Sequence, residues 1–397
     1  MRIRLHKVAL SAFLVIALLL SLASGVSATE PATEPVPTET AASTEAATEP
    51  PVTEPPETVP EETIPEGTEP EGYIVDRTSA IYNICAQMAE TMQARQILVY
   101  DTNTDTILYS KSVAGGKLYP ASITKLFSTY VALQYLDPDT VITAGDELDL
   151  VHEGSSVAFV PKGGQYRVKM LIEGMMLPSG NDAAMVVAAA AGRAIAGDEN
   201  LAPAKAVERF VDEMNLQADA LGFEKSHFCN PDGWHTGAHY TCLNDLARIS
   251  KLALENETIA RYMRKHDEET NSYGGQYVLW ENTNLLLDPD GAYYRRDAIG
   301  MKTGYTRPAG YSLMSAFTHE EGAIVVGLFG YTDKNERFPD AIRLANAARE
   351  QLSWKRNGHK IRKPVLDKNN WACRTACPFF CAIYKKDGPK PVLFIFA

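Results

Sequence analysis

Residues 29–72 consist mainly of Thr, Glu, Pro and Ala in repeated TEP-like units, and they include no aromatic residue and no Lys, Arg or Asp. A segment of this composition has too little apolar surface to bury a core, so we expect a disordered acidic linker. The chain has 397 residues. The linker therefore confines a large folded domain to the part of the chain that follows it.

Residues 1–28 have the pattern of a secretory signal peptide. Three basic residues lie among the first seven, residues 8–23 are almost wholly apolar, and Val26-Ser27-Ala28 supplies small residues for cleavage before Thr29. The apolar run is shorter than the about 20 residues that span a membrane as a helix. We expect export to the cell wall, the outer face of the membrane or the medium, with an uncleaved N-terminal membrane tether as the alternative.

The acidity of the chain belongs to the linker. The linker contains twelve Glu, which matches the formal net charge of −12 of the whole chain. When the three basic residues of the N-terminal segment are also set aside, the remainder carries a net charge of only −3. Because a nearly neutral domain lacks the electrostatic footprint of a nucleic-acid-binding protein, we expect no nucleic-acid partner.

Residues 73–355 alternate helical and strand patterns and indicate one α/β domain whose sheet joins distant segments of the chain. Residues 356–397 follow as a tail without evidence of a second domain. The helical patterns cover residues 81–92, 122–136, 170–176, 182–196, 204–221, 243–254 and 335–354, and the strand patterns cover residues 96–101, 106–110, 298–305, 311–318 and 323–331.

The cysteines are too few and too scattered to act as a disulfide scaffold in a domain of this size. Cys229 and Cys242 are near enough in sequence to form a disulfide, with reduced buried thiols as the more common alternative. Cys373, Cys377 and Cys381 are spaced by four residues in the tail, so on a helix they would share one face. Pro378 would interrupt such a helix, and no nearby His completes a metal site. The six cysteines are Cys85, Cys229, Cys242, Cys373, Cys377 and Cys381.

Ser122-Ile123-Thr124-Lys125 stands at the start of an apolar helical pattern. Helical spacing places the Ser122 hydroxyl and the Lys125 amine on one face. A serine hydroxyl becomes a nucleophile when a neighbouring base takes its proton, and a lysine with a lowered pKa can serve as that base. Taken alone, the pattern fits equally well an N-capping serine followed by a surface lysine.

Two further motifs follow in the order that such a site requires. Ser179-Gly180-Asn181 lies between two helical patterns, where a loop can present a hydroxyl and a carboxamide to a cleft. Lys302-Thr303-Gly304 lies on a late strand. Either motif alone fits a helix cap or an exposed strand lysine. The three motifs together, in this order, are highly specific for one class of active site.

At these residues the sequence resembles the low-molecular-mass D-alanyl-D-alanine carboxypeptidases, a serine peptidase family within the penicillin-binding proteins and serine β-lactamases. The resemblance extends over most of residues 73–354, including GMKTGYTRPAGYSL at residues 300–313, NPDGWHTGAHYTCLNDLA at residues 230–247 and Asn282-Thr283-Asn284. It implies a β-lactamase-like fold, with a five-stranded antiparallel sheet flanked by helices and a mostly helical subdomain. The active site would lie between the two.

The resemblance also implies residue roles. Ser122 attacks the carbonyl between the two terminal D-alanines of a peptidoglycan stem peptide, and β-lactam antibiotics acylate it as inhibitors. Lys125 acts as the base, Ser179 relays the proton and Asn181 orients Lys125.

Strand residues would complete the site. Lys302 and Thr303 bind the substrate carboxylate, and Lys302 lowers the pKa of Lys125 by repulsion between like charges. The backbone N–H groups of Ser122 and Tyr305 form the oxyanion hole, and Gly304 lets the substrate backbone approach. No cofactor and no metal are implied.

Three alternatives need weighing. His235 and His239 could suggest zinc, but their spacer lacks the metalloprotease glutamate and contains a helix-disfavouring glycine. A serine β-lactamase is the main alternative function, yet no Glu within residues 181–302 is followed by Asn at the fourth position, as the deacylating glutamate of class A β-lactamases is. A wall-binding module with a decayed site is disfavoured because every polar catalytic group is present.

Overall fold

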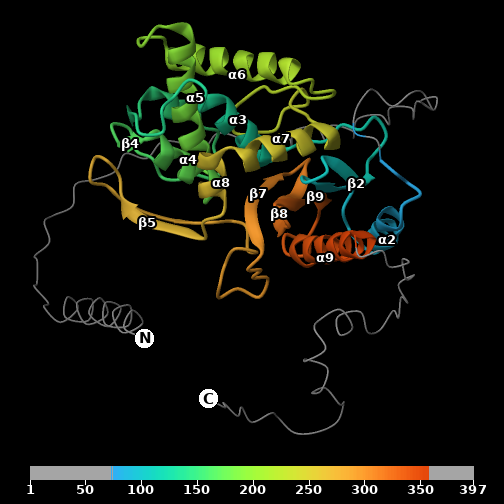
Figure 1. Ribbon diagram of the computed structural model, residues 1–397. Coiled ribbons are helices and arrows are strands. Elements are labelled where there is room, and N and C mark those ends of the chain that lie inside the picture. The colour runs from blue at the N-terminus through green and yellow to red at the C-terminus, as the bar shows by residue number, and fades with distance from the viewer. Residues whose placement is uncertain (1–72, 74, 357–397) are drawn as a thin grey trace, which may run out of the picture. The chain divides into compact units, whose positions relative to one another are not determined.

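The computed structural model describes residue 73 and residues 75–356 (Figure 1). At its centre lies a five-stranded antiparallel sheet with the strand order β2-β1-β9-β8-β7. The hairpin near the start of the domain thus pairs with the last strand, which lies far along the chain. The strands are β1 (Gln96–Asp101), β2 (Thr106–Lys111), β7 (Ala298–Thr306), β8 (Gly310–His319) and β9 (Gly322–Tyr331).

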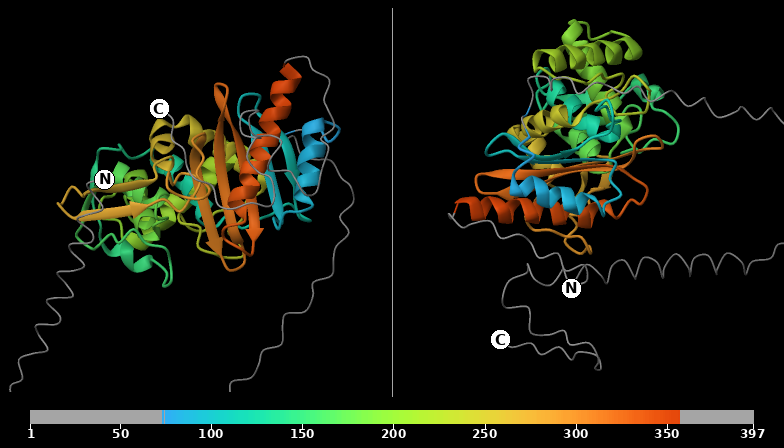
Figure 2. Two further views of the ribbon diagram at one scale, coloured as in Figure 1. Left: turned by 90° about the horizontal axis from the view of Figure 1, so that it is seen from below. Right: turned by 90° about the vertical axis from the view of Figure 1, so that its right-hand side faces the viewer.

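The central strands are apolar over nearly their whole length because both faces of the sheet are covered. In β9 every residue after Gly322 is buried. One face packs against α2 (Ala80–Ala89) and α9 (Arg337–Arg356), which lie side by side below the sheet in the right-hand view of Figure 2. The helical subdomain covers the other face (Figure 1).

The helical subdomain is organised around α5, whose residues are buried almost all round. Its neighbour α6 approaches closely at Gly192, where an added Cβ would lie 1.8 Å from the carbonyl oxygen of Ala206. Only glycine permits this contact. The helices are α3 (Thr124–Ala132), α4 (Val168–Met176), α5 (Asn181–Ala196), α6 (Pro203–Ala220), α7 (Leu243–Glu255) and α8 (Glu257–Met263).

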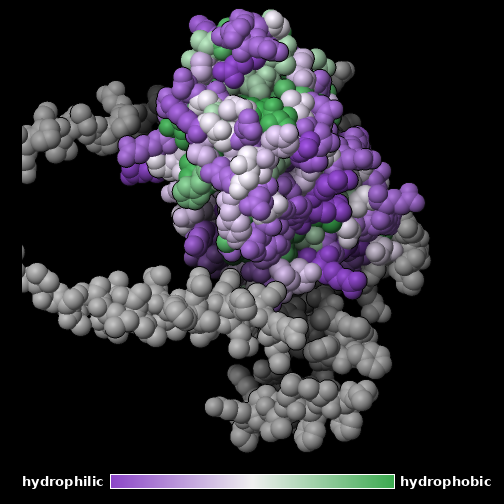
Figure 3. Space-filling view, turned by 90° about the vertical axis from the view of Figure 1, so that its left-hand side faces the viewer, coloured by the Kyte–Doolittle hydropathy of each residue, from purple (hydrophilic) through white to green (hydrophobic). Residues whose placement is uncertain are grey.

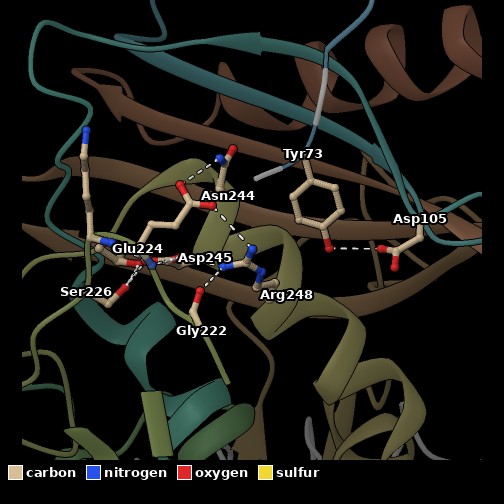
Figure 4. Close-up of polar contacts among 10 residues, drawn as sticks. Tyr73, Asp105, Gly222, Glu224, Ser226, Asn244, Asp245 and Arg248 are labelled. Carbon is tan, nitrogen blue, oxygen red and sulfur yellow. Dashed lines mark hydrogen bonds and ion pairs between the residues drawn. The ribbon is translucent and has the colours of Figure 1, made fainter. Parts of the chain in front are cut away.

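Polar contacts hold the start of the described domain against the sheet and α7 (Figure 4). The Tyr73 hydroxyl donates to Asp105, which also forms an ion pair with Lys251 of α7. On the same helix the buried carboxylate of Asp245 accepts hydrogen bonds from the Ser226 hydroxyl and from the backbone N–H of Glu224. These contacts fix α7 to the segments on either side of it.

The structure confirms the expected fold and corrects several element boundaries. The helix expected from Ser122 to Leu136 begins as a 3-10 turn over Ala121–Ile123 and ends as α3 at Ala132. The sequence patterns missed α8, the short 3-10 segment Asp146–Leu150 and two small hairpins. These elements are short, and periodicity needs longer stretches to be recognised. The hairpins pair β3 (Val141–Thr143) with β4 (Gln165–Arg167) and β5 (Asp267–Asn271) with β6 (Tyr277–Glu281).

Cys229 and Cys242 do not form the disulfide considered from their spacing; together with Cys85 they are free thiols. Burial raises the pKa of Cys85 and of Cys242 to about 12. Cys373, Cys377 and Cys381 lie outside the described residues, as do the expected signal peptide, the linker and the rest of the tail.

Two further properties concern the part of the chain that the structure describes. No helix there combines the length and the apolar character that crossing a bilayer requires. The face drawn in Figure 3 is largely hydrophilic, and its apolar residues form small separate areas.

Candidate active site

A cleft of about 520 Å³ lies between the helical subdomain and the edge strand β7. It is lined by six of the eight residues that the motifs singled out. The other two, Lys125 and Lys302, are buried. The six that line the cleft are Ser122, Ser179, Asn181, Thr303, Gly304 and Tyr305.

Ser122 lies in the 3-10 turn Ala121–Ile123, immediately before α3. Two glycines allow the chain to pack tightly around this turn. A Cβ at Gly233, which has a φ of 84°, would lie 1.8 Å from the Ala121 carbonyl oxygen. A Cβ at Gly304 would lie 3.0 Å from the Pro120 carbonyl oxygen. The serine is therefore held between β7 and the loop that contains Gly233.

Lys125 is completely buried, and its Nζ donates to three oxygens. These are the Ser122 hydroxyl at 3.0 Å, the Asn181 side-chain oxygen at 2.7 Å and the Asp232 carbonyl oxygen at 2.9 Å. Burial lowers the pKa of Lys125 to about 8, against the opposing charges of Asp232 and Asp182. About a tenth of the amine is therefore neutral at pH 7, and this neutral form is the one that a general base requires.

The second motif forms the sharp connection between α4 and α5. Ser179 has a φ of 66° and is buried, and Gly180 donates its N–H to the Gly174 carbonyl. Asn181 begins α5; its amide nitrogen donates to the Ser155 hydroxyl at 3.1 Å while its oxygen accepts from Lys125. These contacts fix the carboxamide beside the lysine.

A buried carboxylate supports this connection from behind. The two oxygens of Asp182 accept the backbone N–H groups of Ala158, Val160 and Ala183. The carboxylate thereby ties the loop that contains Ser155 to the first turn of α5, where a negative charge is also favoured by the helix dipole.

Lys302 is almost completely buried on β7, and its Nζ donates to the Thr303 carbonyl at 3.2 Å. Burial, Lys125 and Arg337 together hold the pKa of Lys302 well below its usual value. We expected Lys302 to lower the pKa of Lys125. In the structure, burial is the first cause of the lowered pKa of Lys125, and burial together with the neighbouring charge of Lys125 lowers the pKa of Lys302.

The outer part of β7 forms one wall of the cleft. The Thr303 hydroxyl is hydrogen-bonded to that of Thr283 at 2.5 Å, so the Asn282-Thr283-Asn284 segment adjoins the third motif. The side chain of Tyr305 is exposed and stacks on Tyr311, with 4.3 Å between ring centroids.

Arg337, at the start of α9, is a cleft residue that the motifs did not reveal. Its guanidinium is buried, lies over the Tyr311 ring and donates to the Ser312 carbonyl at 3.0 Å. Within residues 75–356 no carboxylate forms an ion pair with it, and burial lowers its pKa to about 10. A single arginine beginning a helical pattern gives no signal in sequence; only the tertiary fold places it against β8 and at the cleft.

His239, weighed above as a possible zinc ligand, supports α3, the helix that follows Ser122. Its Nδ1 accepts from the Cys229 backbone N–H at 3.1 Å, so its Nε2 carries the proton and donates to the Thr124 hydroxyl at 2.9 Å. Burial lowers the pKa of His239 to about 3. Nowhere in the described part of the chain are three or more His, Cys, Asp or Glu side chains arranged to hold a metal ion.

A five-stranded antiparallel sheet, a helical subdomain and a Ser–Lys pair at their junction define the class of β-lactamase-like DD-peptidases. The chain belongs to the D-alanyl-D-alanine carboxypeptidase family, whose model matches residues 83–330.

Individual relatives agree with this assignment. D-alanyl-D-alanine carboxypeptidase DacF of Bacillus subtilis is 26% identical over 272 residues, covering 67% of this chain and 65% of the relative, just under two thirds of its length. A D-alanyl-D-alanine carboxypeptidase of a Streptomyces strain is 30% identical over 260 residues, covering 62% of this chain and 84% of the relative. The crystal structure of a Streptomyces DD-transpeptidase matches with a TM-score of 0.57 at 29% identity, covering 65% of this chain and 97% of that chain.

Proposed function

We propose that this protein is a serine D-alanyl-D-alanine carboxypeptidase that removes the terminal D-alanine from peptidoglycan stem pentapeptides through an acyl-enzyme on Ser122. The observation that carries the proposal is the 3.0 Å contact between the Ser122 hydroxyl and a buried Lys125 amine with a lowered pKa. Family membership supports the substrate class. The activity serves the synthesis and remodelling of the cell wall.

Acylation begins when Lys125 takes the Ser122 proton and the serine oxygen attacks the carbonyl carbon of the penultimate D-alanine. Ser179 passes a proton to the departing amine of the terminal D-alanine. The backbone N–H groups of Ser122 and Tyr305 stabilise the oxyanion. Since β7 is an edge strand, the substrate backbone can pair along it. Water then hydrolyses the ester.

Two residues that line the cleft, Thr303 and Arg337, and the buried Lys302 bind the terminal carboxylate of the substrate. Thr303 donates a hydrogen bond, while Lys302 and Arg337 supply positive charge at the same end of the cleft. A bound carboxylate favours the protonated form of Lys302, which burial disfavours in the free enzyme. The site therefore recognises a free C-terminal carboxylate, which β-lactam antibiotics imitate.

We also propose the organisation of the whole chain. Residues 1–28 direct export, residues 29–72 form a flexible spacer, residues 73–355 form the catalytic domain and residues 356–397 form a tail. A coiled spacer of this length spans about 40 Å and an extended one about 140 Å. An N-terminal segment that stays uncleaved would tether the domain to the outer face of the membrane; cleavage would release it to the wall or the medium.

The direct test is incubation with a synthetic stem pentapeptide followed by mass measurement of the product. We expect loss of one alanine, and no loss with Ser122→Ala. The same substitution should abolish covalent labelling by a fluorescent penicillin without lowering the melting temperature, because it removes only the attacking oxygen. An unchanged pentapeptide with the folded wild-type protein would refute the proposed activity.

A second test separates the carboxypeptidase from the β-lactamase. Asp232 is the one acidic residue among those that line the cleft, and no glutamate is present there to activate water against a bulky penicilloyl ester. We expect a chromogenic cephalosporin in excess to give a burst equal to the enzyme concentration and then very slow turnover. Sustained rapid turnover would instead establish a β-lactamase.

A further inference from the structure

Asp232 is a cleft residue whose chemistry the site described so far does not use. Its side chain is completely buried. One carboxylate oxygen, Oδ1, accepts the Trp234 backbone N–H at 3.0 Å. The other, Oδ2, is buried and accepts no hydrogen bond from any described protein group. No Lys, Arg or His of residues 75–356 forms an ion pair with it.

The backbone around Asp232 is fixed relative to the nucleophile. Asn230 bridges the loop by accepting the Gly233 N–H at 2.8 Å and donating to the Trp234 carbonyl at 2.9 Å. Ser128 of α3 donates to the Pro231 carbonyl, and Lys125 donates to the carbonyl of Asp232 itself. The backbone of Asp232 thus has a defined position beside Lys125, and the residue lines the same cleft as Ser122.

A buried carboxylate oxygen without a hydrogen-bond donor is unfavourable, and such atoms in native proteins usually have a functional explanation. The neighbouring charge of Lys125 compensates only in part, since it lies beyond ion-pair distance. Oδ2 therefore lacks a hydrogen-bond donor from the described protein groups, and Asp232 lines the cleft, from which a donor can come. Water can donate this hydrogen bond, and the proposed reaction itself consumes water.

We propose that Asp232 Oδ2 accepts a hydrogen bond from the water that hydrolyses the acyl-enzyme and aims that water at the ester carbonyl. This inference rests on the proposed function. The water oxygen bonds to the carbonyl carbon, and one water proton passes to the neutral Lys125 amine. The bond from carbon to Ser122 Oγ then breaks as Lys125 returns that proton to the oxygen. The second water hydrogen stays with the product acid, and Asp232 takes up no proton in these steps, so it acts as a positioning residue.

The charge of Asp232 has a separate effect on Lys125. The ionisable groups near this amine are Asp232 in the loop, Asp182 on α5 and Lys302 on β7; the two carboxylates raise its pKa against the effect of burial. Removal of either carboxylate charge lowers the pKa of Lys125 further, so the neutral base persists to lower pH. Removal of the Asp232 charge should therefore shift the acid limb of the acylation profile to lower pH while slowing deacylation.

The test compares full-length wild type, Asp232→Asn and Asp182→Asn with a D-alanyl-D-lactate depsipeptide substrate. Lactate release in the burst reports acylation, and steady-state release reports deacylation. The Asp232→Asn variant keeps an oxygen for the Trp234 N–H. Asp182→Asn is the matched control because it removes a similar charge from an aspartate whose oxygens are already occupied. Asp232→Ser, which also keeps an oxygen acceptor, replaces the asparagine variant if that variant does not fold.

We expect the burst rate of Asp232→Asn to stay within a few-fold of wild type while deacylation falls by about 10²-fold, with the acid limb of acylation moved to lower pH. In Asp182→Asn, deacylation should fall no more than acylation does. Unchanged deacylation in Asp232→Asn, or an equal fall in both steps, would overturn the role of Asp232. A folded wild-type protein that releases no lactate at all, either in a burst or at steady state, would refute the proposed function itself, and the two failures are thus distinguishable.

Discussion

At the residue scale, the site works by placing ionisable groups where water cannot reach them. Burial lowers the pKa of Lys125 to about 8, as the proposed role of general base requires, and two carboxylates moderate that effect. His239 is the opposite case: burial keeps it neutral, and both of its nitrogens serve in hydrogen bonds that hold α3. Burial thus suits Lys125 to its proposed role as a base and keeps His239 as a neutral hydrogen-bonding group.

The pH dependence of acylation follows from Lys125. Because the neutral amine is the active form and its pKa is about 8, the acylation rate constant should rise with pH and level off above about 8. Lys125→Ala should lower that constant by about 10² to 10⁴ and remove the limb. The measurement is the rate of fluorescent-penicillin labelling over a pH range that brackets this pKa. A mild loss in the alanine variant would contradict the assignment of Lys125 as the base.

At the element scale, the helical subdomain places the second motif. Ser179 and Asn181 stand at the entrance of α5, and α5 can reach Lys125 only because it packs closely against its neighbours. At Gly192, α5 and α6 approach so closely that there is no room for a Cβ.

Gly192→Ala should therefore force α5 and α6 apart. The added Cβ would lie 1.8 Å from the Ala206 carbonyl oxygen. We expect a loss of about 3 kcal/mol in the free energy of unfolding, measured in urea. Gly197→Ala at the end of the same helix is the control: its φ is 66°, its Cβ meets nothing within 4 Å, and it should cost only about 1 kcal/mol. Equal losses in the two variants would show that helix spacing is not the cause.

At the scale of the whole molecule, the sheet joins segments from both ends of the domain, and the cleft lies where its edge strand meets the helices. All the groups used in the proposed reaction lie between Ser122 and Arg337. The catalytic unit is thus set by long-range pairing and not by any contiguous piece of the chain.

Deletion of residues 372–397 should leave pentapeptide hydrolysis within about twofold of the full chain, because every motif lies outside them. Specific activity and melting temperature should be measured side by side. If activity is lost while the melting temperature holds, the tail takes part in catalysis or substrate binding.

Sequence alone determined the fold class, the order of the main elements and the three motifs. These features are local: helical and strand periodicity records which face is buried, and the motifs are short runs of adjacent residues. The same patterns overestimated the helix after Ser122 and missed the β5–β6 hairpin, because short polar elements depend on their surroundings.

Only the tertiary structure decided how the site is completed. Arg337 and Asp232 lie 105 residues apart in sequence (337 − 232), and neither stands in one of the three motifs. Folding brings both to the cleft and buries them, and burial changes their chemistry. Burial in the folded protein also lowers the pKa of Lys125 and of Lys302. The burial of these side chains, and the pKa shifts that it causes, depend on which segments from distant parts of the sequence pack around them. Only the tertiary structure shows which segments those are.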